Sequence, residues 1–461
     1  MTIEEIVLAL ESLSTHEDRV VVSMELPSEV SVKRRKITHL VPSGSVNVIR
    51  GDANQDGLAF LSRYNQSSDM NGFHLPTCYT SPISSGSLGV ENVWKVDLGK
   101  CIDASPLVVQ HRAHEGRASS TWAIVGSHSA KLVCVDVQIG QEIWRVTLDD
   151  RIEACAALSV KHQLVYVGTY AGTFFALHLQ TGEISWRFQA QGTIKSSALV
   201  LNTLGLVVVG AYDNKLYALD AATGQKQWAM DLQGSVFSTP FYCAWSKQLF
   251  AASTNGNVVA FSSSSDDAEF ASIQEQWRLQ LPAPVFAGLN ADPLSHLLLV
   301  GCADGNLYGV KLESGEIQWQ IPTEKPIFSS PCVHGTGSVV FGSHDGKLRK
   351  VDTCTGELQW ATNLSGAVFA SPTVVRLVAE PVNGGDGILI CCVTTTSGQL
   401  CFCDEKTGVI IYQTGDASGR ILDSIEANGD LGPLFGSPVL VDNWCLLGTR
   451  TNYFYGMKLT S

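Results

Sequence analysis

The stretch Thr355-Gly356-Glu357-Leu358-Gln359-Trp360 decides the fold, because versions of it recur along the whole chain. In the regular copies an aromatic residue stands four positions after the turn glycine. Tyrosine replaces tryptophan in one copy, and a Ser-rich insertion replaces the turn in another. The eight repeat positions are Trp94, Trp144, Trp186, Trp228, Trp277, Trp319, Trp360 and Tyr412. Their spacing of about 42 residues is typical of propeller blades or solenoid units.

The residues between two tryptophans predict four short strands. A small-residue and apolar run, Ser330 to Val333, is followed by a β-branched run that ends at Gly342. The dipeptide Asp345-Gly346 tolerates positive φ and therefore predicts a tight hairpin turn. Four meandering strands make one propeller blade, and we expect each tryptophan to pack its apolar face between neighbouring blades.

The two ends of the repeat array predict how the ring closes. The last third-strand pattern, Phe454 to Leu459, lies against the C-terminus, and the Trp94 strand has no strands of its own blade before it. An open ring would leave two unpaired strand edges. We therefore predict an all-β, eight-bladed β-propeller in which the Trp94 strand pairs with residues 437–459.

The complete signature Asp-x-x-Thr-Gly-x-x-x-Trp occurs from Asp220 to Trp228 and from Asp352 to Trp360. It resembles the repeat of pyrroloquinoline-quinone (PQQ) propellers, which are quinoprotein-like, and the resemblance covers residues 91–461. The diverged, cysteine-rich repeats are most similar to the C-terminal propeller of the beta-alanine-activating enzyme family, which is acyl-CoA-synthetase-like and also called aminoadipate-semialdehyde dehydrogenase. The resemblance implies a full-length protein that activates beta-alanine with ATP and loads it as a thioester on a carrier domain. The propeller would then serve as a recognition module or scaffold.

The region before the propeller predicts two further segments. Residues 1–41 are interpreted as a short leader with one helix and one strand, and residues 42–90, rich in Ser, Gly and Asn, as a flexible linker. The basic cluster Lys33 to Lys36 is either a solvated patch or a docking patch. The sequence shows neither a Gly-rich phosphate loop nor a carrier-type serine motif. We therefore expect a truncated chain without adenylation and carrier domains, and a propeller that is not itself catalytic.

Composition excludes several classes of protein. The net charge of −13 argues against nucleic-acid binding, which needs a basic surface. We expect no membrane segment, because no apolar run approaches about 18 residues, and no secretory signal. The thirteen cysteines lie mostly inside strand patterns, so reduced thiols in a cytoplasmic protein are expected.

The most informative candidate site is the residue that enters each innermost strand. Each one follows Ile, Val or Leu and should lie at the mouth of the central channel. The eight residues are Asp103, Glu153, Lys195, Phe237, Phe286, Phe328, Phe369 and Phe435. Three charges beside five phenylalanines fit a ligand pocket with an apolar wall. In the alternative, the phenylalanines pack between blades and the charges face water.

Three other motifs carry weaker hypotheses. Asp52 to Gly57 matches the first half of a calcium loop, but the twelfth position is Arg63, which favours a simple turn. The vicinal pair Cys391-Cys392 is reminiscent of a disulfide in some quinoproteins, although adjacent strand residues point to opposite faces. His111 and His114 lack a third metal ligand nearby in sequence.

A quinone site would need calcium ligands, and a cation there would be opposed by Lys195. We therefore predict no cofactor and no metal. A protein partner or carrier domain is the expected ligand. The alternatives are a PQQ-dependent dehydrogenase and a protein-assembly scaffold similar to the bacterial outer-membrane assembly propeller.

Overall fold

The computed structural model describes residues 58–61, 77–80, 88–111, 119–263, 272–334, 337–379, 388–414 and 431–460. The chain divides into two compact units, Met1–Leu40 and Val41–Ser461, and all described residues belong to the second. The predicted leader, its basic cluster and the candidate calcium motif from Asp52 to Gly57 lie outside the described residues.

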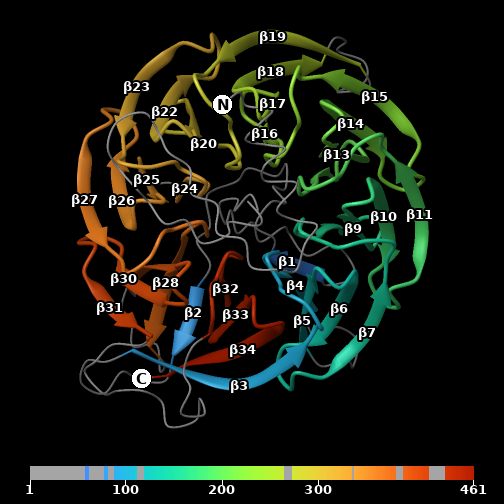
Figure 1. The fold of residues 1–461 in the computed structure, drawn as a ribbon, viewed down its shortest axis with the longest axis vertical. Coiled ribbons are helices and arrows are strands. Elements are labelled where there is room, and N and C mark those ends of the chain that lie inside the picture. Colours follow the sequence, from blue (N-terminus) through green and yellow to red (C-terminus); the bar gives the residue numbers. More distant parts are fainter. Residues whose placement is uncertain are drawn as a thin grey trace, which may run out of the picture. The chain divides into compact units, whose positions relative to one another are not determined.

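Eight sheets, each built on four antiparallel strands, follow one another in chain order around a common axis (Figure 1). The first four blades, each from the innermost strand outward, are blade 1 with β4 (Leu107–His111), β5 (Ser120–Gly126), β6 (Lys131–Asp136) and β7 (Glu142–Thr147); blade 2 with β8 (Ala157–Ser159), β9 (Leu164–Gly168), β10 (Thr173–His178) and β11 (Ile184–Gln189); blade 3 with β12 (Leu199–Leu201), β13 (Leu206–Gly210), β14 (Lys215–Asp220) and β15 (Lys226–Asp231); and blade 4 with β16 (Phe241–Cys243), β17 (Gln248–Ala252), β18 (Asn257–Ser263) and β19 (Ile273–Gln280).

The second half of the ring repeats this order. Its blades are blade 5 with β20 (Asn290–Asp292), β21 (Leu297–Gly301), β22 (Asn306–Lys311) and β23 (Ile317–Pro322); blade 6 with β24 (Cys332–Val333), β25 (Ser338–Gly342), β26 (Lys347–Asp352) and β27 (Leu358–Asn363); blade 7 with β28 (Thr373–Ala379), β29 (Ile388–Thr394), β30 (Leu400–Asp404) and β31 (Ile410–Gln413); and blade 8 with β32 (Val439–Val441), β33 (Trp444–Gly448), β34 (Tyr453–Thr460) and β3 (Gly89–Asp97).

Blade 8 confirms the predicted closure. Its outermost strand is β3, which pairs antiparallel with β34 from Gly89 opposite Thr460 to Asp97 opposite Tyr453. The strand that carries Trp94 therefore completes the blade built by the C-terminal strands, and the eight-bladed ring has no open end.

Two short strands were not predicted. β1 (Leu58–Leu61) pairs antiparallel with β4, and β2 (Thr77–Thr80) pairs parallel with β28. Both lie in the range 42–90 that the sequence analysis assigned to a linker. Each adds a fifth strand to the inner edge of a blade, so the backbone groups on those edges of blades 1 and 7 are paired.

Repeat tryptophans join one blade to the next, as predicted, and six of them do so through a hydrogen bond. The indole Nε1 of Trp319 donates a hydrogen bond of 2.9 Å to the carbonyl of Thr353, and Trp94, Trp144, Trp186, Trp277 and Trp360 make the equivalent bond. The Trp319 ring also covers Gly356, the turn glycine of the next blade. A Cβ at Gly356 would lie 2.9 Å from Cγ of that ring, and its φ of +74° favours glycine as well.

The aspartate of the repeat signature holds the turn together. Oδ1 of Asp352 accepts hydrogen bonds from the amide and the hydroxyl of Thr355, at 2.9 and 3.1 Å. Asp220 and Asp404 bind Thr223 and Thr407 in the same way. This closed turn explains why Asp and Thr recur at this spacing, since short polar side chains satisfy the turn's own amides.

The core is divided among the blade interfaces. Eight separate apolar clusters each join two neighbouring sheets, from the cluster between blades 8 and 1 onward. The vicinal cysteines show this division, because Cys391 lies in the cluster of blades 6 and 7 and Cys392 in that of blades 7 and 8. Both are free thiols, as are the other ten cysteines described. No helix among the described residues is long and apolar enough to cross a membrane.

Candidate functional site

The eight predicted loop residues occupy one ring around the propeller axis, and we call them the channel ring. Each is placed by the aliphatic residue before it, which packs on a small residue at the end of the preceding blade's second strand. Ile152, for example, lies against Gly126, where a Cβ would come within 2.3 Å of its Cγ2. Because the aliphatic side chain is fixed outward into the blade interface, the following residue, Glu153, is directed toward the axis.

The five phenylalanines of the channel ring form an unbroken aromatic arc. Ring centroids are 5.3 Å apart for Phe237 and Phe286, 5.8 Å for Phe286 and Phe328, 4.9 Å for Phe328 and Phe369, and 5.0 Å for Phe369 and Phe435. All five are buried. The alternative interpretation expected these phenylalanines to pack between blades. They do pack against one another from blade to blade, and their contacts run around the propeller axis.

The three charged members of the channel ring are also buried, which the same alternative did not expect. Asp103 is fully buried, and Glu153 and Lys195 expose 2% and 8% of their surface. Glu153 lies 3.7 Å from Nζ of Lys195, which in turn lies 6.0 Å from the ring centre of Phe237. The charged sector therefore continues directly into the aromatic arc.

Two residues that the sequence analysis missed complete the circle. Arg450 bridges Phe435 and Asp103, with its guanidinium 3.8 Å from the Phe435 ring centre and 2.7 Å from Oδ2 of Asp103. His128 bridges Asp103 and Glu153, at 3.2 and 4.0 Å. Both follow the second strand of their blades by two residues, and the amide of His128 donates to the carbonyl of Cys101.

The same loop position, two residues after the second strand, carries tyrosines in the next two blades. Tyr170 and Tyr212 occupy it in blades 2 and 3, and each lies beside Lys195, whose Nζ is 4.7 and 5.1 Å from the two ring centres. The guanidinium of Arg151 stacks on Tyr170, 3.4 Å from its ring centre, and Nε of Arg151 lies 3.1 Å from Oε1 of Glu153. Alignment of the repeats at this position could have identified His128, Tyr170, Tyr212 and Arg450 from the sequence.

Electrostatic interactions fix the protonation of the charged sector. Burial alone would raise the pKa of the Asp103 carboxyl, but Arg450 and the hydrogen bond from His128 outweigh burial and hold that pKa well below its usual value. Burial alone would lower the pKa of His128, but the hydrogen bond to Asp103 and the charges of Asp103 and Glu153 raise it to about 10. His128 is therefore an imidazolium at neutral pH.

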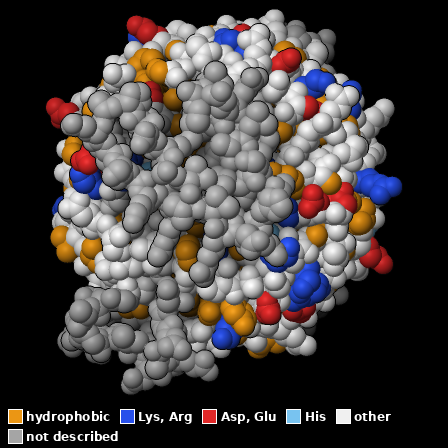
Figure 2. Space-filling view, viewed as in Figure 1, with side chains coloured by type: hydrophobic (Ala, Val, Ile, Leu, Met, Phe, Trp, Pro, Cys, Tyr) orange, Lys and Arg blue, Asp and Glu red, His pale blue; other side chains and the backbone are white. Residues whose placement is uncertain are grey.

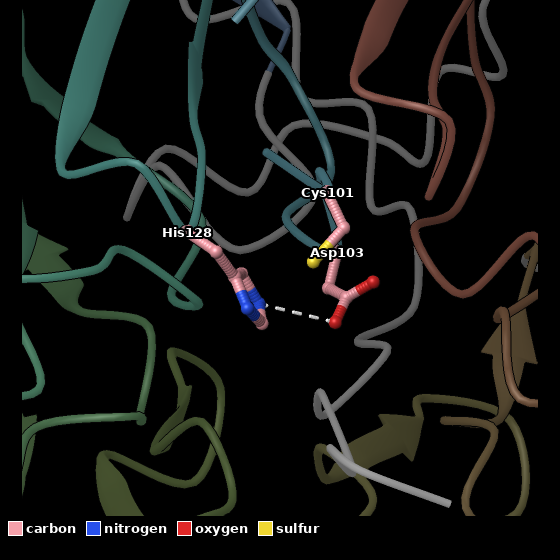
Figure 3. Close-up of side chains that lie close together, drawn as sticks. All are labelled: Cys101, Asp103 and His128. Atoms are coloured by element: carbon pink, nitrogen blue, oxygen red, sulfur yellow. Dashed lines mark ion pairs between the residues drawn. The ribbon is translucent and has the colours of Figure 1, made fainter. Parts of the chain in front are cut away.

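Cys101, Asp103 and His128 are close enough to be considered as metal ligands (Figure 3). Their candidate ligand atoms lie within 4.8 Å of one another. The surrounding charges oppose a cation, because Arg450 occupies both oxygens of Asp103, at 2.9 and 2.7 Å, and the imidazolium offers no lone pair. The donor set therefore does not fit a metal ion in this protonation state.

The remaining sequence hypotheses concern residues away from the channel ring. His111 is the last residue of β4, and its ring centroid lies 4.2 Å from that of Trp122. His114 lies outside the described residues. Burial raises the pKa of the Cys391 and Cys392 thiols well above the ordinary range, which is typical of structural cysteines.

The fold and the repeat define this chain as an eight-bladed propeller of the quinoprotein-like type. Solved structures of the same fold include BamB from Moraxella catarrhalis (16% identity, TM-score 0.57, covering 80% of this chain and 98% of that one) and quinohemoprotein alcohol dehydrogenase from Comamonas testosteroni (12%, TM-score 0.58, 83% and 78%). The computationally designed protein Ika8 is similar too (15%, TM-score 0.59, 80% and 99%). At these identities the likeness concerns the fold alone.

The family is narrower than the fold. Residues 98–459 match the family described as "Beta-alanine-activating enzyme, beta-propeller", and the chain belongs to that family. Beta-alanine-activating enzymes of Mus musculus and Homo sapiens are 39% and 37% identical to it over 77 and 91 residues. These matches cover 17% and 18% of this chain, and only 7% and 8% of the length of those relatives.

Proposed function

We propose that this propeller is the recognition module of a beta-alanine-activating, acyl-CoA-synthetase-like system and is not itself catalytic. Membership of the propeller family supports the link to that system. In this proposal the adenylation and carrier steps take place on other domains, and the propeller binds the carrier domain or its cargo at the channel ring.

The closed channel ring is the observation that carries this proposal. Its polar groups are held by ion pairs with one another, as in the contacts of Arg450 with Asp103 and of Lys195 with Glu153. Its apolar members form a continuous arc of packed rings. A ring of side chains with one charged and one aromatic sector suits recognition, because preorganised side chains lose little entropy on binding.

Direct binding tests the proposal. The full chain is immobilised, and the adenylation and carrier portions of the human relative are passed over it in separate runs. We expect saturable binding of one of them, weakened at least about 10-fold by Lys195→Met, which removes a ring charge but keeps the aliphatic stem. Lys311→Met is the matched control, because Lys311 is exposed and pairs with Glu316 on the surface.

An enzymatic assay covers the dehydrogenase alternative. The chain is incubated with PQQ, Ca²⁺, an alcohol and a redox dye. Absence of partner binding together with PQQ-dependent dye reduction would overturn the recognition proposal and favour a quinone-dependent enzyme. Absence of both activities would also overturn it and would favour an assembly scaffold.

A further inference from the structure

The exposed aliphatic side chains of the described residues gather at one end of the propeller. Because successive strands of a blade run antiparallel, the turn between the first and second strands and the turn between the third and fourth strands lie at the same end. We call it the lower end, and the loops of the channel ring lie at the opposite end. The exposed large hydrophobic residues lie in the turns of the lower end, at the start of a strand that leaves one, or just before a repeat tryptophan. They are Val93, Ile139, Ile143, Ile184, Leu294, Ile317, Leu358, Ile388 and Val409.

Three of these residues belong to the neighbouring blades 5 and 6. Leu294 is 64% exposed in the turn between β20 and β21. Ile317 is 38% exposed at the start of β23, and Leu358 is 53% exposed at the start of β27. Single exposed aliphatic residues are common on protein surfaces, so contacts between these three decide whether they form one surface.

Leu294 reaches across the junction to blade 6. A Cβ at Gly337 would lie 2.7 Å from Cδ2 of Leu294, so the leucine side chain covers this glycine. The carbonyl of Gly337 accepts a hydrogen bond of 2.9 Å from the amide of Thr353. Cys354, the next residue, is exposed. Leu294 therefore lies beside the turn that carries Cys354.

The other two aliphatic residues adjoin the same turn. Nε2 of Gln318, the residue after Ile317, donates a hydrogen bond of 3.5 Å to the carbonyl of Cys354. Leu358 begins the strand that leaves the turn. We call the connected surface the lower strip, and its residues are Leu294, Ile317, Cys354 and Leu358.

The charge around the lower strip is negative. Its three turns contain three glutamates, one histidine and no lysine or arginine. They span residues 293–296, 312–316 and 353–357. Glu316 pairs with Lys311 of β22, at 2.7 Å. Glu313 and Glu357 are exposed, and neither forms an ion pair with another described residue.

This charge disfavours several occupants of the lower strip. A symmetric contact with a second copy would bring two acidic strips together, and each chain carries a net charge of −13. Anionic lipids and nucleic acids are repelled for the same reason. Around the described part of the rim in Figure 2, acidic and basic side chains are interspersed, so a surface of single sign is a local feature. The lower strip therefore suits a short basic segment.

We infer that the lower strip docks a basic, amphipathic segment of a partner protein. The aliphatic or aromatic side chains of this segment pack on Leu294, Ile317 and Leu358, and its lysines or arginines face Glu313 and Glu357. The inference goes beyond the proposed function, because the channel ring lies at the opposite end of the blades.

Fluorescence anisotropy with the full chain tests the inference in about 150 mM NaCl, where loose surface attraction is screened. The probe is a labelled helical peptide of about 18 residues, with leucines on one face and lysines on the other. Two matched peptides carry glutamate in place of lysine, or serine in place of leucine. We expect the leucine–lysine peptide to bind with a Kd of about 100 µM or tighter, and each matched peptide to bind at least about 10-fold more weakly.

Two variants locate the binding site. Leu294→Ser/Leu358→Ser removes two anchors of the lower strip and should weaken binding of the leucine–lysine peptide about 10-fold or more. Ile184→Ser is the matched control. Ile184 is 48% exposed and follows Glu183 on blade 2 as Leu358 follows Glu357 on blade 6. This control should change the Kd by less than about 2-fold.

Alkylation tests the same surface without changing its aliphatic residues. Cys354 is exposed within the lower strip, so a bulky maleimide on its thiol should block the peptide. Cys354→Ser treated with the same maleimide should bind the peptide as the untreated protein does. If the double variant does not fold, this comparison decides.

Four outcomes would overturn the inference. The leucine–lysine peptide does not bind, the glutamate peptide binds as tightly, Leu294→Ser/Leu358→Ser behaves like Ile184→Ser, or the chain sediments as a dimer that the double variant dissociates. Failure here is distinct from failure of the proposed function, which is tested with Lys195→Met at the opposite end of the propeller. Binding of the carrier or adenylation portion that depends on Lys195 leaves the proposed function intact whatever the lower strip does.

Discussion

Arg450 and Asp103 are joined by a two-point ion pair, with Nε to Oδ1 at 2.9 Å and Nη2 to Oδ2 at 2.7 Å. Arg450 follows the second strand of blade 8, and Asp103 precedes the first strand of blade 1. The pair therefore spans the junction where the two ends of the propeller meet. It acts beside the β3–β34 ladder, so side chains as well as backbone close the ring.

Removing Arg450 should destabilise the protein strongly. Arg450→Met leaves the fully buried Asp103 without its main partner, and we expect the free energy of unfolding to fall by about 3–5 kcal/mol. Arg145→Met, which breaks an exposed pair, should cost about 0–1 kcal/mol. Urea denaturation measures both. The double variant Arg450→Met/Asp103→Asn should recover part of the loss, and a loss equal to the sum of the single variants would contradict this account.

The turn glycine under Trp319 should tolerate no side chain. Gly356→Ala forces a Cβ against Trp319 and places alanine at a φ of +74°, so we expect a loss of about 2–4 kcal/mol in unfolding free energy. Gly205→Ala is the matched control. Gly205 has a φ of +65° but open space around it, so only the backbone cost of about 1–2 kcal/mol applies. Equal losses in the two variants would show that the tryptophan contact contributes nothing.

The sequence predicted the fold because each blade repeats the same local rules. The Asp352–Thr355 turn, the glycine and the tryptophan are all visible as a motif, and closure followed from the unpaired edges at both ends. Strands β1 and β2 escaped prediction because they are short and carry no repeat signature. Their pairing depends on the open inner edges of blades 1 and 7, and these edges exist only once the blades have formed.

The site was predictable in position but not in its contacts. Alignment of the repeats identified the channel ring, including the sector with Asp103, Glu153 and Lys195. It did not show that these charges are buried, because their partners His128 and Arg450 come from a different loop, the one after the second strand of a blade. Burial of a charge depends on such long-range pairs, and only the assembled ring brings them together.

The cysteines should separate into two classes by reactivity. Cys354 is exposed, whereas Cys302, Cys391 and Cys392 are buried. Burial raises the pKa of Cys302 to about 12 and disfavours its reactive thiolate. Brief treatment of the native protein with a maleimide should therefore label Cys354 and leave these three unmodified until the chain is unfolded, as measured by peptide mass spectrometry. Labelling of Cys391 in the native protein, or its recovery in a disulfide with Cys392, would contradict the structure.

His128 should make the protein less stable at alkaline pH. Its pKa is about 10 in the folded protein and 6.5 as the ordinary value, so the native state holds the proton more tightly. The resulting stabilisation is fully present below about pH 6.5 and is lost as pH rises toward about 10. Asp103 has the opposite sign: its lowered pKa stabilises the fold above its ordinary value of 3.8, and that stabilisation is lost as pH falls further.

Urea denaturation between pH 6 and 10 measures the contribution of His128. The free energy of unfolding should decline over this range, and His128→Gln should largely remove the decline, since glutamine can donate to Asp103 but does not titrate. Asp103, Glu153 and Cys101 act on His128, and the substitution leaves all three in place, so the comparison isolates the imidazole. Parallel curves for the parent and His128→Gln across this range would show that the imidazole is neutral in the folded state.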